Sequence, residues 1–142
     1  MVGALGTMEA VGFFTTGNKV VSLVMTIITA VTSTIIPRMS YLVGNGKEEE
    51  AVLLQKKTIN LLNYIALPMI AGLVILAKPI ILVFSGEEFL PSVIVLQILS
   101  FLLIVIPWSS FLGLQILYPI RKEKYGNYAV IIGALVNLVL NF

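Results

Sequence analysis

The chain has 142 residues, of which 58% are hydrophobic and 11% are charged, and its formal net charge is +2. A soluble domain carries about 25% charged residues, so this composition predicts a multi-pass membrane protein. The chain contains no Cys, no His and no Asp, which excludes disulfides, thiolate nucleophiles and imidazole metal sites. We therefore expect no enzyme activity, no metal or cofactor site and no nucleic-acid partner.

Apolar stretches of spanning length predict an all-α fold. We expect helices at about 10–42, 48–77, 91–119 and 125–142, which are long enough to cross or nearly cross a hydrocarbon core of about 30 Å. The fold class is therefore a polytopic membrane helix bundle with four transmembrane helices, and residues 1–142 form a single transmembrane region. Lys78 and Pro79 end the second helix, because the residue before a proline avoids helical geometry. The apolar run 79–84 is too short to span and predicts an interfacial continuation or half-turn within an outer loop at about 79–90.

The basic residues predict the orientation. Loops at about 43–57 and 121–124 are flanked or filled by Lys and Arg, so the positive-inside rule assigns both to the cytoplasm. The first residue then lies outside, although the N-terminus does not resemble a signal peptide. Together with an apolar run at the other end, this indicates a fragment of a longer membrane protein. A small, complete four-helix protein is the alternative.

The first helix carries one hydrophilic stripe. Val20–Pro37 contains no charge, yet polar residues recur at spacings of three and four and fall within one sector of the helix. We name this set the polar stripe; it comprises Thr15, Asn18, Lys19, Ser22, Thr26, Thr29 and Ser33. The pattern predicts a substrate pathway with a cationic end, of which this helix supplies one wall.

Two alternatives stay open for the polar stripe. Small hydroxylated residues also let membrane helices approach and hydrogen-bond to one another, so packing alone can explain several of them. Lys19 either faces a cavity or lies close enough to the surface to extend its ammonium into the headgroups. The pairs Asn60–Asn63 and Asn137–Asn141 are interpreted as contacts between helices.

Two prolines inside predicted helices are hinge candidates. Pro68 and Pro107 each remove a backbone donor from a membrane helix and are expected to kink it. Broken helices in transporters often mark the parts that move or bind substrate. A kink is also expected at Pro37, near the end of the first helix.

Three stretches carry a resemblance to a known family. They read VGFFTTGNKV, PRMSYLVGNGKEEE and GLQILYPIRKEKYGNYAVIIGALVNLVLN. These stretches are similar to the polysaccharide transporter family of O-antigen-type, lipid-linked oligosaccharide flippases. That family belongs to the superfamily that also holds multidrug extruders and the lipid II flippase. Phe14 stands where many relatives have tyrosine, and Lys19 stands where such sequences often have a basic residue.

The resemblance implies a parent fold of twelve to fourteen helices in two bundles around a central cavity, of which this chain supplies part of the C-terminal bundle. Such proteins move undecaprenyl-diphosphate-linked oligosaccharide across the cytoplasmic (inner) membrane for surface polysaccharide biosynthesis. The implied partners are the lipid bilayer, the lipid-linked glycan, and a missing N-terminal bundle or another membrane subunit. Two alternatives are a small structural or assembly membrane protein without transport activity, and an extruder of drugs or lipid II.

Overall fold

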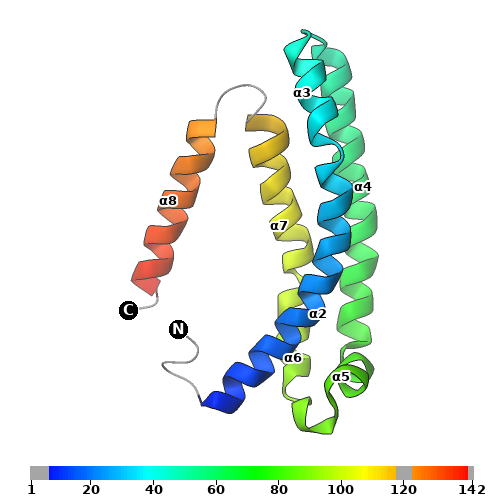
Figure 1. Ribbon diagram of the computed structural model, residues 1–142, viewed down its shortest axis with the longest axis vertical. Helices are drawn as coiled ribbons and strands as arrows, with labels where there is room; N and C mark the ends of the chain where they lie inside the picture. Colours follow the sequence, from blue (N-terminus) through cyan, green and yellow to red (C-terminus); the bar gives the residue numbers. More distant parts are fainter. Residues whose placement is uncertain (1–6, 118–122, 141–142) are drawn as a thin grey trace.

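The computed structural model describes residues 7–117 and 123–140, and every regular element within them is a helix (Figure 1). The all-α prediction is therefore confirmed. In chain order the elements are α2 (Met8–Ser33), α3 (Ile36–Gly44), α4 (Glu48–Ile75), α5 (Ala77–Ser85), the 3-10 turn η1 (Glu87–Phe89), α6 (Ser92–Ser100), α7 (Leu102–Ser110), the π-helical segment η2 (Phe111–Leu117) and α8 (Glu123–Leu140).

The number of helices differs from the prediction. When α2 with α3, and α6 with α7 and the start of η2, are each counted as one helix, the described residues form five helical bodies, not four: Met8–Gly44, Glu48–Ile75, Ala77–Ser85, Ser92–Gly113 and Glu123–Leu140. Three of these described bodies are long and apolar enough to cross a membrane: Met8–Gly44, Glu48–Ile75 and Ser92–Gly113. The 18 residues of α8 begin with Glu123 and Lys124, which shortens its apolar run.

The additional helix is α5, which occupies the start of the range predicted as an outer loop. Lys78 and Pro79 were expected to end the second helix, and α4 does end nearby at Ile75. However, Pro79 lies in the first turn of α5, where a missing backbone N–H costs nothing because that donor has no partner within the helix. The same proline therefore stops one helix and fits the start of the next.

The kink expected at Pro37 is present, as a break between α2 and α3. α2 ends at Ser33, and α3 begins at Ile36 with Pro37 in its first turn. In the break, the backbone N–H of Ile35 donates to the carbonyl of Thr32 at 3.2 Å, which is the shorter pattern of a 3-10 turn. The first membrane helix is therefore built from two pieces.

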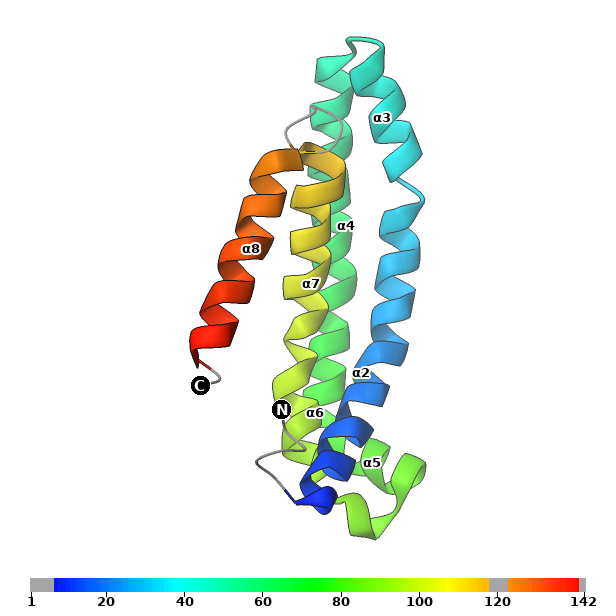
Figure 2. The same ribbon diagram turned by 60° about the vertical axis from the view of Figure 1, so that its left-hand side comes forward.

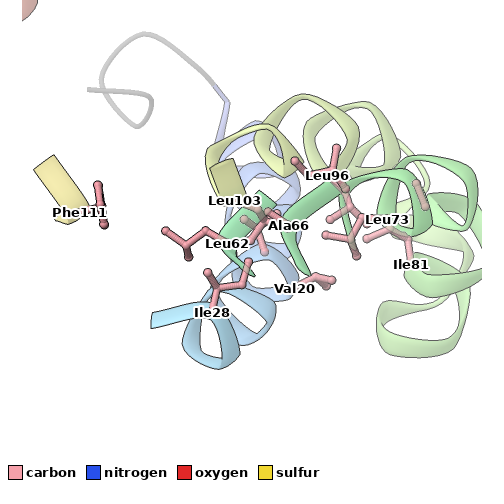
Figure 3. Close-up of a cluster of buried hydrophobic side chains, with 12 residues drawn as sticks. Val20, Ile28, Leu62, Ala66, Leu73, Ile81, Leu96, Leu103 and Phe111 are labelled. Atoms are coloured by element: carbon pink, nitrogen blue, oxygen red, sulfur yellow. The ribbon is translucent and has the colours of Figure 1, made fainter. Parts of the chain in front are cut away.

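The core lies where α2 crosses α6 and α7 and packs beside α4. Figure 3 shows Val20 and Ile28 of α2 meeting Leu62 and Ala66 of α4, with Leu96 beside them. The other buried members of this cluster come from α2, α4, α5, α7 and η2: Val21, Ile70, Leu73, Ala77, Ile81, Leu103 and Phe111. The three spanning bodies thus form one packed unit.

Two parts of the chain extend away from this core. α3 and the start of α4 form a hairpin that projects past the end of α7 in both views, and it has a small hydrophobic cluster of its own (Figures 1 and 2). Gly46 makes its turn, with a φ of 69° that favours glycine. The second part is α8, which diverges from α7; residues 124–139 other than Gly126 are exposed.

Candidate functional site

The polar stripe lies on the face of α2 that points away from the core. Six of its residues are exposed, and the seventh, Thr29, is half-buried. The opposite face of α2 supplies the buried residues, which are Gly17, Val20, Val21, Ile28 and Thr32. α2 therefore presents an apolar face to its own chain and a polar face that no described part of the chain covers.

Most hydroxyls of the stripe bond to their own helix. The side chain of Thr15 donates to the carbonyl of Val11 at 2.7 Å, and that of Thr26 donates to the carbonyl of Ser22 at 2.9 Å. Thr29 and Ser33 make equivalent bonds within α2 at 2.9 to 3.1 Å. A hydroxyl that bonds the preceding turn tolerates lipid as well as water, so these four residues do not by themselves require a wet surface.

The remaining stripe residues are chemically more demanding. Asn18, Lys19 and Ser22, which we name the cationic cluster, are exposed, and their side chains have no hydrogen bond or ion pair to the described part of the chain. Ser22 lies four residues after Asn18 and three after Lys19, so it neighbours both side chains on the helix surface. They present an ammonium, an amide and a hydroxyl together, groups that suit the oxygens of a phosphate.

Close packing holds the backbone beneath the cationic cluster. Gly17 precedes it on the core side of α2, where a Cβ would lie 3.0 Å from Val95 Cγ1 and 3.1 Å from the backbone nitrogen of Leu96. One turn earlier, Phe13 meets Phe89 of η1 edge to face, with the ring centroids 6.0 Å apart. The turn of α2 that carries the cationic cluster is therefore fixed against α6 and η1.

The two hinge candidates lie in different surroundings. Pro68 is exposed within α4, which continues through it as one helix. Pro107 is buried within α7, and the chain changes to the π-helical segment η2 soon after it. Because π-helical segments are rare and often occur at functional sites, Pro107 is the stronger candidate. Movement at either residue stays a prediction.

Two polar contacts between helices were not predicted as pairs. The indole Nε1 of Trp108 donates to Asn63 Oδ1 at 3.0 Å, which joins α7 to α4. Gln97 Nε2 donates to the carbonyl of Val74 at 3.0 Å, near the end of α4 where carbonyls lose their helical partners. Both contacts are half-buried, and both serve packing. The first contact agrees with the interpretation of Asn63 as a contact between helices, whereas Asn60, predicted with it, is exposed.

Other candidate features lie elsewhere or outside the described residues. A shallow apolar hollow of about 490 Å³ lies on α7 and is lined by Ile104, Val105, Trp108, Ser109 and Leu112, away from the polar stripe. Within the described residues, no group of three or more acidic side chains gathers as a metal site would need. The predicted loop 121–124 and Asn141 fall wholly or partly outside the described residues.

Comparison with known proteins identifies the family. A family model described as "polysaccharide biosynthesis protein" matches residues 1–94, which include α2 with its polar stripe. The chain belongs to this family. The match confirms the polysaccharide transporter family predicted from the sequence, and it gives this family member a role in polysaccharide biosynthesis or transport in a membrane. No curated protein and no solved structure matched the chain.

Proposed function

We propose that this family member forms part of a flippase that moves undecaprenyl-diphosphate-linked oligosaccharide across the cytoplasmic membrane for surface polysaccharide biosynthesis. The observation that carries the proposal is the cationic cluster, Asn18, Lys19 and Ser22, on the uncovered face of an otherwise apolar helix. The ammonium neutralises charge on the diphosphate, while the amide and the hydroxyl orient its oxygens. The chain binds and moves this substrate and performs no covalent chemistry on it.

The position of Lys19 along the helix fits a substrate that enters or leaves at a membrane surface. Lys19 and Arg38 are 19 residues apart, about 28 Å at 1.5 Å per residue, which nearly equals the thickness of the hydrocarbon core. When Arg38 lies at the cytoplasmic surface, Lys19 lies close to the outer one. There its ammonium meets the diphosphate headgroup at the end of the transfer.

A pathway needs a second wall. Polar side chains that lack a hydrogen bond within their own helix, as those of Asn18 and Ser22 do, are costly against lipid, so such faces in membranes usually turn toward protein or water. The other wall of this pathway comes from a separate N-terminal bundle or another membrane subunit, which covers the polar stripe. With only the bilayer around it, the stripe would have no cavity to line.

Cysteine labelling along α2 tests whether the polar stripe is wet. Ser22→Cys and Thr26→Cys probe the stripe, while Leu23→Cys and Ile27→Cys probe exposed apolar positions at the same depth. In cells, a water-soluble thiol reagent should modify the two stripe positions and spare the two apolar ones. Equal reactivity on both faces would rule out a water-lined pathway along the stripe.

Binding of the substrate headgroup tests the role of Lys19 directly. We expect Lys19→Gln to weaken binding of undecaprenyl diphosphate by about tenfold, because a hydrogen bond to a charged group is lost, while Lys19→Arg retains it. Lys78→Gln is the matched control, since Lys78 is another exposed lysine and lies on a different helix. If Lys19→Gln binds undecaprenyl diphosphate as tightly as the unaltered chain does, the proposed contact between Lys19 and the diphosphate is wrong.

The internal hydrogen bonds of the stripe favour a second candidate function. Thr15, Thr26, Thr29 and Ser33 donate to carbonyls of α2 itself, as they would in a helix that packs against a neighbour or against lipid. A structural or assembly protein would use the stripe for packing only. That function predicts protection of Ser22→Cys and Thr26→Cys, the reverse of the labelling expected for a flippase.

A further inference from the structure

The α3–α4 hairpin extends beyond the hydrocarbon core. The body Met8–Gly44 has 37 residues and Glu48–Ile75 has 28, about 55 and 42 Å at 1.5 Å per residue. Both exceed the core thickness of about 30 Å. The charge-free runs Val20–Pro37 and Ile59–Ala77 mark the part of these helices that lies in the hydrocarbon core. Residues 38–44 and 48–58 then lie beyond the core on the hairpin side, as the projection of the hairpin past α7 in Figures 1 and 2 also indicates, whereas residues 8–19 lie at the opposite end.

Cations gather where the hairpin meets the membrane. Arg38 directly follows one charge-free run, and Lys56 and Lys57 shortly precede the other. Met39 of α3 is buried in the small cluster of the hairpin, and Leu54 of α4 is half-buried against that cluster, so the cations one to three residues from them lie at a similar height along the hairpin. We name Arg38, Lys56 and Lys57 the basal cations. All three are exposed.

The charges of the hairpin are separated along its length. At the tip, Lys47 pairs with Glu50 at 2.9 Å, and Glu48 and Glu49 lie beside them in the first turn of α4. The basal cations form no ion pair with the described part of the chain. The hairpin therefore has a tip whose positive charge is compensated and a base whose positive charge is not.

We propose that the basal cations bind the headgroup of an anionic phospholipid in the surrounding leaflet. They lie at the ends of the charge-free runs, which is the level of the headgroups, and they come from both helices of the hairpin. A lipid phosphate between them compensates charge that the described chain leaves uncompensated. The exposed ring of Tyr41, one turn from Arg38, suits the same interfacial layer. This site is separate from the polar stripe and does not depend on the proposed function.

Lipid selectivity of the purified chain tests the proposal. The chain in mixed micelles with equal phosphatidylglycerol and phosphatidylcholine is transferred to native mass spectrometry, and the retained lipids are counted. We expect phosphatidylglycerol to be preferred. Replacing Arg38, Lys56 and Lys57 together by Gln should weaken its binding by about a hundredfold, at about fivefold for each charge near the surface.

Two further variants distinguish lipid binding at the basal cations from attraction by the overall positive charge of the hairpin. Lys47→Gln removes one positive charge from the same hairpin but at its tip, so it should keep the preference for phosphatidylglycerol. A variant with Arg38→Lys, Lys56→Arg and Lys57→Arg should also keep it, because the charges are preserved. Equal retention of the two lipids by the unaltered chain would overturn the proposal. So would a preference that survives in the triple Gln variant, or one that is lost equally in Lys47→Gln.

Discussion

Gly17 gives the sharpest test of how α2 is held. A Cβ at this position would lie 3.0 Å from Val95 Cγ1, 3.2 Å from Val95 Cβ and 3.1 Å from the backbone nitrogen of Leu96. The side chain of Val95 can shift, but the backbone of α6 cannot do so without moving the helix. Gly17→Ala therefore forces α2 and α6 apart, and overpacking of this kind costs about 1 to 3 kcal/mol.

A second glycine provides the matched control. Gly72 also lies within a helix, but a Cβ there would meet nothing within 4 Å. In both variants the higher helix propensity of alanine adds about 1 kcal/mol to the free energy of unfolding. We therefore expect Gly72→Ala to raise the free energy of unfolding by about 1 kcal/mol. The free energy of unfolding of Gly17→Ala should be about 1 to 3 kcal/mol lower than that of Gly72→Ala, because only Gly17→Ala overpacks a contact.

Fluorescence of Trp108, the single tryptophan, can follow unfolding of the chain in micelles by denaturing detergent. The comparison between the two variants cancels the helix preference and isolates the contact between α2 and α6. If Gly17→Ala proves as stable as Gly72→Ala, the close approach of α2 to α6 is wrong, and so is the anchoring of the cationic cluster that depends on it.

Two predictions concern the polar contacts between helices. Asn63→Ala removes the acceptor of the Trp108 indole, so it should lower the free energy of unfolding by about 0.6 kcal/mol and shift the tryptophan emission. The control is Asn60→Ala, at an exposed position one turn away, which should change neither the stability nor the emission. Gln97→Leu leaves the carbonyl of Val74 without its donor and should cost about 1 kcal/mol in the same unfolding assay, whereas no change would mean that another donor replaces the amide.

The sequence was sufficient for the fold class and for the two-faced character of α2. Hydrophobic composition and run length identify membrane helices because the bilayer imposes both. The positions of the stripe residues follow from the helical repeat alone, so they share one face in the structure as predicted. A kink at Pro37 was also expected, since proline cannot supply the backbone hydrogen bond of a continuous helix, although the structure has a break there in place of a kinked single helix.

Hydropathy could not distinguish the core from the exposed apolar surface. Val21 is buried, whereas Leu23, two residues later, is exposed. Likewise Ile28 is buried, whereas Ile27 beside it is exposed. In a membrane protein both faces are apolar, because lipid accepts the same side chains as a protein core does. The sequence pattern therefore located the polar stripe but not the face on which α2 meets the other helices.

Long-range partners were also beyond prediction from sequence. The bond from Trp108 to Asn63 spans 45 positions of the chain, and the bond from Gln97 to Val74 spans 23. Each polar residue alone indicated a contact between helices, but its partner depends on the register of two packed helices. The helix α5 was missed for a different reason, since Pro79 was interpreted only as a stop, although the first turn of a helix accepts proline.

The arrangement of tight and interrupted packing limits how this bundle can move. Around the cationic cluster, the contact of Gly17 with Val95 and that of Phe13 with Phe89 hold α2 against α6 and η1. The irregular backbone lies elsewhere, at the break before Pro37 and in the π-helical segment after Pro107. Packed interfaces resist gradual deformation, so under the proposed flippase function a movement that opens the pathway at its other end has to bend at these irregular segments. Under the same proposal, the cationic cluster is the fixed outer end of the pathway, and the opposite end of the bundle supplies the motion.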